Sequence, residues 1–499
     1  MPDRAFRLTD TMTRAKREVE CGEPGHLRFY SCGPTVYNYA TIGNFRTFLT
    51  ADLVMRTAEA LGWRVTYVSN ITDVGHLTAD DAADLSGEDR MEKALKSKEG
   101  ERFVNIWDLA EHYTRALEED WARLNLREPY VRPRATQHMR EQIVAAQDLI
   151  EKGFAYATPL GVYFRVSAFE GYGKLSGNRD QESLKRAVRD VVQDPGKEHA
   201  ADFALWKHDE KHLMQWHSPW GWGFPGWHLE CSVMAMKYLG ETIDLHAGGE
   251  DLIFPHHECE IAQSEALTGK PFSRMWIHTR FLLVNGERMA KSKGNFFTVS
   301  DLMEKGADPL AIRYALISQN YGTPHNFTMD LLRDATQKVE RYRACDAAVD
   351  KALKADRPGE DSLGAELEAL YGEALDAMCD DLNTSVALAK ALEGTRLVLR
   401  EGDGMSAASA RSAQTFLDGV NALFGIVRHE RDAGPACDCP KDLRSADDER
   451  IESKIAERTE AKAAKDFARA DAIRAELEAE GIELRDGPEG TTWRRRGLL

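Results

Sequence analysis

A strand, a loop, a helix and a second strand follow one another near the start of the chain. Residues 27–31 (LRFYS) form a short apolar run, and residues 64–68 (RVTYV) alternate as a strand does. Between them, apolar residues recur at helical spacing from Phe45 to Leu61, and Gly62 ends that pattern. This order builds parallel sheets, so the sequence predicts an α/β fold.

Two polar segments come directly after the two predicted strands. The loop CGPTVYNYATIGN follows the first strand, and residues 70–73 follow the second. Parallel sheets bind their ligands at the carboxyl ends of the strands. We therefore expect a functional site where these two segments meet.

The rest of the chain reads as a mixed α/β front followed by a helical back. Residues 76–102 are polar and acidic, which indicates an inserted surface segment. The patterns further predict helices over 103–125 and 136–152, strands over 161–167, 242–246 and 276–284, and a loop over 171–200.

The back half is rich in Ala, Leu and Glu. It is predicted to be helical from about Pro309 to residue 427, and a linker with Pro and Cys occupies 429–445. The last segment, 446–499, holds a charged helix over about 448–480 and a short end punctuated by glycines.

Charge and composition exclude several classes of protein. The chain has 65 Lys and Arg against 82 Asp and Glu, a net charge of −17, which repels phosphate on average and argues against a general nucleic-acid binder. A local basic face is still compatible with this balance. No apolar run approaches the ~20 residues of a membrane span, and the first residues lack a secretory signal. Eight cysteines are too few for a disulfide scaffold, so we expect a cytoplasmic protein with reduced thiols.

Four side chains have the donor chemistry of a zinc site: Cys32, Cys231, His256 and Glu260. His256 and Glu260 are four residues apart and share one face if PHHECEIAQSEAL is helical. Two thiolates, an imidazole and a carboxylate suit tetrahedral zinc. Spacing alone leaves a second interpretation open, in which the cysteines are small core residues and the histidines are structural.

Two short segments have the composition of phosphate-binding loops. RMAKSKGN, at 288–295, sets two lysines beside a glycine, and ammonium groups neutralise charge that builds up in a transition state. In TIGN, at 41–44, Gly43 allows a nucleotide close to the backbone at a helix N-terminus, which favours phosphate. Each segment alone is equally compatible with an ordinary solvated turn.

The ordered combination of motifs is far more specific than any one of them. The motifs are CGPTVYNYATIGNFRTF, NITDVGH, PRAT, DFALWK, PGWHLECS, HAGGEDLIFPHHECEIAQSEA and RMAKSKGNFFTV. In this order they resemble bacterial cysteinyl-tRNA synthetases, a family of class I aminoacyl-tRNA synthetases. The helical back half (DDLNTSVALA) and the tail (AKAAKDFARADAIRAELEAEGIELRDGPEGTTW) resemble the anticodon-binding region of that family.

The resemblance implies a Rossmann-like, parallel-sheet catalytic domain over 1–290, with an insertion at about 100–200. It further implies a signature loop and stem-contact helical region over 291–345 and an all-helical anticodon-binding bundle over 346–430. Residues 446–499 would then form a small C-terminal region for anticodon recognition.

The resemblance also assigns the nucleotide site. Thr41-Ile42-Gly43-Asn44 stands where the family has His-Ile-Gly-His, and Arg288-Met289-Ala290-Lys291-Ser292 stands where it has Lys-Met-Ser-Lys-Ser. The implied catalytic residues are Thr41, Asn44 and Lys291. The implied ATP contacts are these three together with Gly43 and Arg288.

The resemblance makes Cys32, Cys231, His256 and Glu260 the ligands of one zinc ion per chain. It gives contacts with the amino-acid substrate to Thr72, Trp227 and Asp251.

The implied activity is that of a cysteine--tRNA ligase. L-cysteine is activated by ATP with Mg²⁺ to cysteinyl-adenylate and is then transferred to the 3′ end of tRNA(Cys), by a monomer that needs no membrane. Two rival interpretations are compatible with parts of the same pattern. A cysteine ligase of the mycothiol pathway has no use for residues 346–499. A weakened paralog is favoured only by the replacement of both signature histidines, at Thr41 and Asn44.

Overall fold

The computed structural model describes most of the chain. The described residues are 4–75, 89–178, 196–289, 293–429, 446–464, 466–480, 482–487 and 490–495. Within them, no helix is both long enough and apolar enough to cross a membrane.

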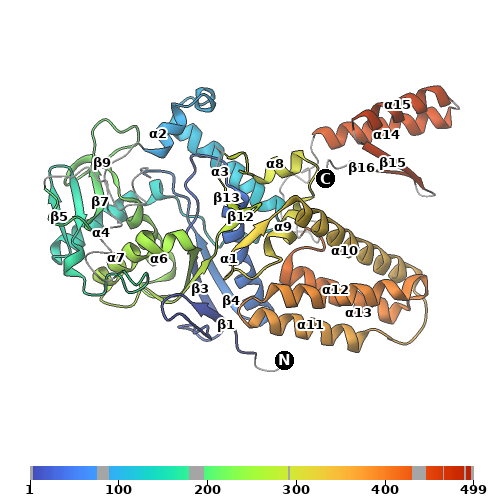
Figure 1. The fold of residues 1–499 in the computed structure, drawn as a ribbon, viewed down its shortest axis with the longest axis horizontal. Coiled ribbons are helices and arrows are strands. Elements are labelled where there is room, and N and C mark those ends of the chain that lie inside the picture. The colour runs from blue at the N-terminus through green and yellow to red at the C-terminus, as the bar shows by residue number, and fades with distance from the viewer. Residues whose placement is uncertain are drawn as a thin grey trace.

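A four-stranded parallel sheet forms the centre of the front half (Figure 1). Its order is β11-β10-β3-β4, with β3 at His26–Ser31, β4 at Arg64–Ser69, β10 at Ile243–Gly249 and β11 at Ser273–Thr279. Helix α1 (Ile42–Ala60) connects β3 to β4. The predicted β-α-β unit is therefore confirmed, and helix α1 begins three residues before the apolar pattern that predicted it.

A long insertion separates β4 from β10. Its helices are α2 (Arg90–Leu95), α3 (Ile106–Arg123) and α4 (Met139–Glu151). The last two confirm the predicted helices. Its five-stranded antiparallel sheet, in the order β5-β6-β7-β9-β8, has strands at Ala155–Thr158, Gly161–Phe164, Phe203–His208, Gly221–Pro225 and Trp216–Ser218. Of the segments expected over 76–102 and 171–200, residues 76–88 and 179–195 lie outside the described residues.

Two helices after the insertion lead back to the parallel sheet. Helix α6 (Trp227–Leu239) precedes β10, and α7 (Glu258–Thr268) follows it and packs against α6. A small hairpin, β1 (Arg7–Asp10) and β2 (Ala15–Glu18), lies beside the outer strand β11. Short helical turns occur at Glu99–Arg102, Ala135–His138, Val166–Ala168, Glu250–Leu252, Ile253–His257 and Gly402–Gly404.

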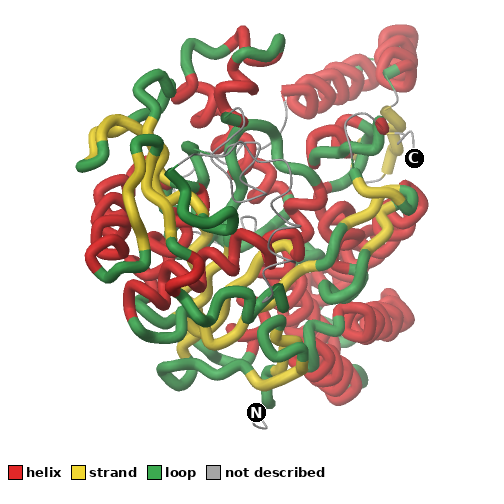
Figure 2. Tube along the Cα trace, turned by 60° about the vertical axis from the view of Figure 1, so that its left-hand side comes forward, coloured by secondary structure: helices red, strands yellow, loops and turns green. Residues whose placement is uncertain are grey.

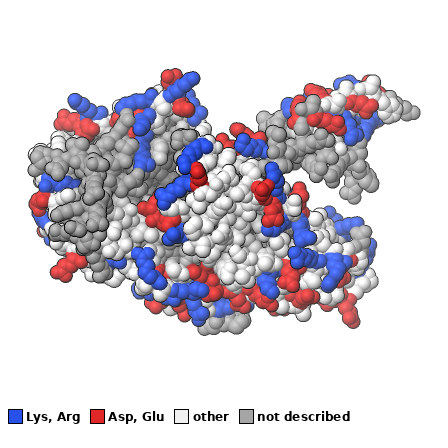
Figure 3. Space-filling view, in the orientation of Figure 1, with Lys and Arg blue, Asp and Glu red and all other residues white. Residues whose placement is uncertain are grey.

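The helical back half contains a small sheet and a four-helix bundle. The sheet has the order β13-β12-β14, at Glu287–Arg288, Leu282–Val284 and His325–Phe327. Helices α8 (Val299–Glu304) and α9 (Pro309–Ile317) lead to the bundle, whose helices α10 to α13 span Met329–Ala355, Gly364–Cys379, Thr384–Glu401 and Ala407–Phe424. In Figure 2 the bundle lies on the opposite side of the parallel sheet from the antiparallel sheet. Figure 3 shows Lys and Arg interspersed with Asp and Glu over this face of the bundle.

Two predicted elements are each divided in the structure. The strand expected over 276–284 is β11 and β12, separated at Arg280 and Phe281. The helix expected over 448–480 is α14 (Ala446–Ala463) and α15 (Phe467–Ala479), because the Asp466 side chain accepts from the Arg469 N–H and starts a new helix. The chain ends in the hairpin β15 (Ile482–Gly487) and β16 (Gly490–Arg495). Most of the predicted linker, 430–445, lies outside the described residues.

A buried ion cluster joins the parallel-sheet half to the bundle. Asp52 of α1 accepts from Arg56 Nε at 2.7 Å and also pairs with Arg313 of α9, and all three side chains are fully buried. Both guanidinium groups also donate to carbonyls at the C-terminal end of α13: Arg56 to Ala422 at 2.9 Å, and Arg313 to Phe424 at 2.6 Å. Helix C-termini carry partial negative charge, which helps to balance the second guanidinium.

Removing one partner from this buried ion cluster should lower the stability of the folded protein. Burial raises the pKa of Asp52, but the charges of Arg313 and Arg56 outweigh it and lower the pKa overall. Arg313→Met breaks a buried pair and leaves a carbonyl of α13 without its donor, so it should lower the free energy of unfolding by about 3–5 kcal/mol. The exposed Arg333→Met should cost less than about 0.5 kcal/mol. Urea unfolding at pH 7 measures both.

The same cluster should make stability depend on pH. Because the folded pKa of Asp52 is lowered, its contribution is present above the unfolded pKa of about 4 and is lost as the pH falls through the folded value. The difference in the free energy of unfolding between Arg313→Met and the parent should therefore become smaller at acidic pH. Equal unfolding midpoints for the Arg313 and Arg333 variants at pH 7 would contradict this account.

Candidate active site

The loop after β3 and the turn after β4 lie against each other, as the sequence predicts. The backbone N–H of Gly33 donates to Asn70 Oδ1 at 2.8 Å. A Cβ at position 33 would lie only 1.6 Å from the Asn70 carbonyl oxygen, so only glycine allows this approach. The backbone of Val36 also donates to the carbonyl of Thr72, at 3.1 Å.

The four predicted metal ligands meet at the carboxyl end of β3. Cys32 directly follows β3, Cys231 lies in α6, and Glu260 lies in α7. His256 precedes α7 in a short π-helical turn. Their donor atoms all lie within 4.8 Å of one another, and all four side chains are buried. We call these four residues the four-donor cluster. Cys32 lies 199 residues before Cys231 in the sequence, and the fold brings it beside the donors of α6 and α7.

A second possible set shares Cys32 and Glu260 but uses His246 and His257. Hydrogen bonds distinguish the two sets. His246 Nε2 lies 2.9 Å from Glu260 Oε2, and His257 Nδ1 lies 2.7 Å from His278 Nε2.

His246 and His256 each keep one buried ring nitrogen without a hydrogen-bond partner among the described residues, Nδ1 of His246 and Nε2 of His256. Only at His256 is this the nitrogen beside Glu260. The Nε2 of His256 lies 3.0 Å from Glu260 Oε1. A nitrogen aimed at two sulfurs and a carboxylate suits a metal ligand, whereas His246 is placed to orient the Glu260 carboxylate.

Burial and charge act in opposite directions within the cluster. Burial raises the pKa of Cys32 well above its usual value. Burial also raises the pKa of Cys231, but the hydrogen bond from Cys32 and the contacts with His256 bring it down to about 6. For Glu260, burial raises the pKa, while the charge of His246 and the contacts with His256 lower it well below the usual value. The protein therefore favours the ionised form of Cys231 and of Glu260.

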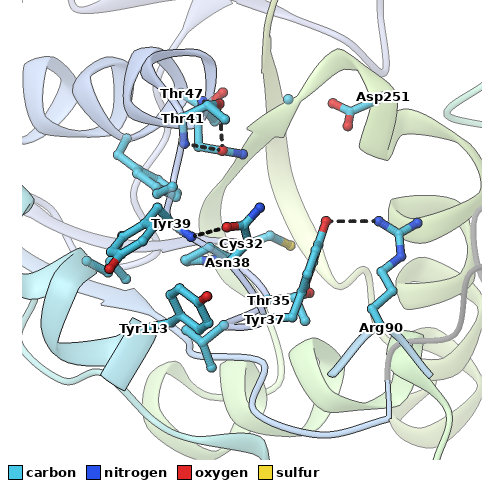
Figure 4. A pocket seen from close by; sticks show the side chains of 18 of the residues that line it. Cys32, Thr35, Tyr37, Asn38, Tyr39, Thr41, Thr47, Arg90, Tyr113 and Asp251 are labelled. Carbon is cyan, nitrogen blue, oxygen red and sulfur yellow. Dashed lines mark hydrogen bonds between the residues drawn. The ribbon is translucent and has the colours of Figure 1, made fainter. Parts of the chain in front are cut away.

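A cavity of about 460 Å³ opens beside this cluster. Its lining includes Cys32, Thr41, Asn44, Trp227 and Asp251 of the predicted site residues. In Figure 4, Thr41 and Asp251 lie on opposite sides of the cavity, and Cys32 lies between the Thr41 side and the Tyr37 side. The Trp227 ring lies 4.1 Å from the ring of His256, so the cavity reaches the four-donor cluster.

The other end of the cavity is the N-terminus of α1. Thr41 is the N-cap: its Oγ1 accepts from the Asn44 N–H at 3.2 Å and donates to Asn44 Oδ1 at 2.8 Å. Asn44 Oδ1 also accepts from the Thr41 N–H at 2.9 Å, which completes a capping box. These side-chain contacts use only the oxygen of the Asn44 amide, and Asn44 lines the cavity. The first turn of α1 has no acidic residue, so its positive end can accept phosphate.

The two predicted nucleotide signatures are neighbours. A Cβ at Gly43 would lie 2.6 Å from the terminal methyl of Met289, so the first signature packs directly on the second. The Ile42 N–H also donates to the Phe297 carbonyl at 3.0 Å. Arg288 is described and lies at the end of the exposed strand β13, whereas Lys291 lies outside the described residues.

Thr72, predicted to contact the amino-acid substrate, does not line the cavity. Among the other described residues of the predicted site, the lining also lacks Gly43, Arg288, Cys231, His256 and Glu260. Thr72 is buried, and its hydroxyl donates to Glu230 Oε2 at 2.8 Å. Burial raises the pKa of Glu230 well above the usual value for a carboxyl. Sequence reasoning did not single out Glu230, although it directly precedes Cys231 in the HLEC motif. The aromatic wall from Tyr37 to Tyr39 was also missed, because it belongs to a loop with no periodic pattern.

Comparison with known proteins agrees with this geometry. A family model described as the catalytic domain of class I (C) tRNA synthetases matches residues 18–337. Over 514 residues, the chain is 55% identical to the cysteine--tRNA ligase of Salinibacter ruber, with 99% of each chain covered. It is 43% identical to that of Symbiobacterium thermophilum, with 98% of this chain and 99% of the relative covered. The chain belongs to the cysteine--tRNA ligase family.

Solved structures with low sequence identity share the fold. A Mycobacterium tuberculosis methionyl-tRNA synthetase in complex with methionyl-adenylate has a TM-score of 0.57 at 14% identity, covering 80% of this chain and 92% of that one. A leucyl enzyme from Agrobacterium radiobacter, in a ternary complex with tRNA, has a TM-score of 0.59 at 11% identity and covers 84% and 86%. The class I synthetase fold predicted from the sequence is confirmed.

Proposed function

We propose that the chain activates L-cysteine with ATP and transfers it to the 3′ end of tRNA(Cys). The observation that carries this proposal is a single cavity with two different ends. One end meets a buried cluster of two thiols, an imidazole and a carboxylate, and the other is the positive N-terminus of α1. A thiol substrate and a nucleotide phosphate fit these two ends.

The four-donor cluster is proposed to hold one zinc ion through Cys32, Cys231, His256 and Glu260. Two sulfurs, one nitrogen and one oxygen are donors that zinc accepts, and the unpartnered Nε2 of His256 fits a ligand. When bound, zinc would supply a site that prefers a sulfur ligand to a hydroxyl. His246 holds the Glu260 carboxylate in place, and Trp227 closes the wall between the cluster and the cavity.

At the other end, Asn44 and the first N–H groups of α1 are proposed to bind the phosphates of ATP, together with Lys291, Arg288 and Mg²⁺. Gly43 lets the two signatures approach each other. Thr41 acts by capping α1, which leaves the NH₂ group of Asn44 to donate. The cysteine carboxylate attacks the α-phosphate, and catalysis comes from positioning and from stabilisation of the developing charge.

The middle of the cavity is proposed to bind the cysteine backbone. Asp251 lies across from Thr41, where a carboxylate meets the substrate ammonium group. Thr72 is proposed to act from behind the wall, through its bonds to Glu230 and Asn70. The bundle over 346–430 and the segment 446–499 are proposed to bind the anticodon part of the tRNA, which the mycothiol-type ligase would not need.

Zinc content tests the ligand assignment. The purified protein should hold about one zinc per chain, and Cys231→Ser should lose most of it, because losing one of four ligands opens the site. Cys345→Ser changes a cysteine buried in α10 and should keep the metal. Elemental analysis that finds full zinc in Cys231→Ser would refute the assignment.

Selection of cysteine over serine tests the function itself. Cysteine should drive ATP–pyrophosphate exchange more than ~10⁴-fold faster than serine, which corresponds to about 5.5 kcal/mol. In the presence of tRNA(Cys), radiolabelled cysteine should become attached to the RNA. A serine rate within a hundredfold of the cysteine rate, or exchange without charging, would contradict the proposal.

The capping box provides an isosteric test of Asn44. Asn44→Asp keeps the oxygen that caps α1 but replaces the NH₂ donor by a negative charge. Pre-steady-state adenylate formation should slow by roughly tenfold or more, because a hydrogen bond to a charged group is worth about 1.5–3 kcal/mol. Thr41→Ser keeps both capping bonds and should slow the step by less than about threefold. If both variants matched the parent, Asn44 would be a helix cap only.

A further inference from the structure

The break between β11 and β12 is held from the side of the cavity by one carboxylate. The Phe281 N–H donates to Glu250 Oε1 at 2.7 Å, and Arg280 Nε pairs with Glu250 Oε2 at 2.9 Å. Glu250 directly precedes Asp251, the residue proposed to bind the substrate ammonium group. The backbone of Phe281 is therefore tied to the turn that carries Asp251.

The same break is also held by a residue of helix α1. Arg46 is buried, and its guanidinium donates to the carbonyls of Arg280 at 3.0 Å and of Phe281 at 3.1 Å. It also donates to the carbonyls of Asn320 at 3.1 Å and Thr323 at 2.8 Å. A planar donor with four acceptors fixes the position of the break relative to the start of α1.

After the break, the chain turns back over Phe281. Strands β12 and β13 form a hairpin whose turn residues, Asn285 and Gly286, have φ of 52° and 81°, as a tight type I′ turn requires. The hairpin brings Arg288 back toward the break. The guanidinium carbon of Arg288 lies 3.9 Å from the centre of the Phe281 ring.

We propose that Phe281 is a positioning residue for the nucleotide: its ring holds the Arg288 guanidinium in the orientation that meets the ATP phosphates. This inference rests on the proposed ATP site. Arg288 lies on an exposed strand, and a free arginine side chain there loses up to about 2 kcal/mol of rotamer entropy when it binds. The ring face pre-orders the cation before ATP arrives. Because Glu250 holds Phe281, the turn with Asp251 and the side chain of Arg288 are both in contact with Phe281 or its immediate partner.

Calorimetric titration of the full-length chain with Mg·ATP tests this inference directly. Phe281→Leu removes the ring and keeps the backbone hydrogen bonds, so the Kd for ATP should rise about two- to fivefold. Phe281→Tyr, in contrast, keeps an aromatic ring and should bind ATP with the affinity of the parent. The KM for cysteine and the zinc content should stay as in the parent for both variants, which a general loss of structure would not allow.

A double-mutant cycle separates positioning from simple packing. In the background of Arg288→Ala, Phe281→Leu should weaken ATP binding no further, because its target is already absent. The inference would be overturned if the two substitutions raised the Kd for ATP additively, or if Phe281→Tyr bound ATP as weakly as Phe281→Leu. It would also be overturned if Phe281→Leu raised the KM for cysteine as much as the Kd for ATP. If the parent bound ATP but showed no cysteine-driven pyrophosphate exchange, the proposed function would be overturned instead. The double-mutant cycle could still be interpreted, because it needs only ATP binding.

Discussion

Two thiols, an imidazole and a carboxylate packed into one buried cluster are the constraint on which the site depends. Cys32, Cys231, His256 and Glu260 come from the end of β3, from α6, and from the start of α7. Burial of such groups is costly unless their charges are balanced. His246 supports one oxygen of Glu260, whereas the Nε2 of His256 points at the other donors without a hydrogen-bond partner. This set of donors could hold a metal ion, which is the basis of the proposed zinc site.

Helix α1 is the second organising element, because it reaches every other part of the machinery. Its capped N-terminus, at Thr41, forms the end of the cavity where ATP is proposed to bind. One turn later, Arg46 holds the break before the second signature. Further along α1, Asp52 pairs with Arg313 of α9, and Arg56 donates to a carbonyl at the end of α13. Helix α1 thus contacts one end of the cavity, the break before the hairpin that carries Arg288, and the bundle.

The sequence was sufficient for the features that depend on local pattern. The strand, helix and strand at the start, and the site at the carboxyl ends of the strands, followed from periodicity. The motif order then gave the family. Local pattern missed the break at Arg280, because an apolar run resumes directly after it at residues 281–284. Only the distant partners Glu250 and Arg46 reveal the break. Local pattern also missed the capping role of Thr41, which depends on the rotamer of Asn44, and it gave no means to separate His256 from His246 as a ligand.

The central claim is that this cavity selects cysteine by binding its sulfur at the four-donor cluster. Zinc K-edge X-ray absorption of the full-length protein, measured before and after the addition of L-cysteine, tests it most directly. The account predicts two sulfur ligands from Cys32 and Cys231, one more when cysteine is added, and no change with L-serine. A sulfur count that stays at two with saturating cysteine would contradict it.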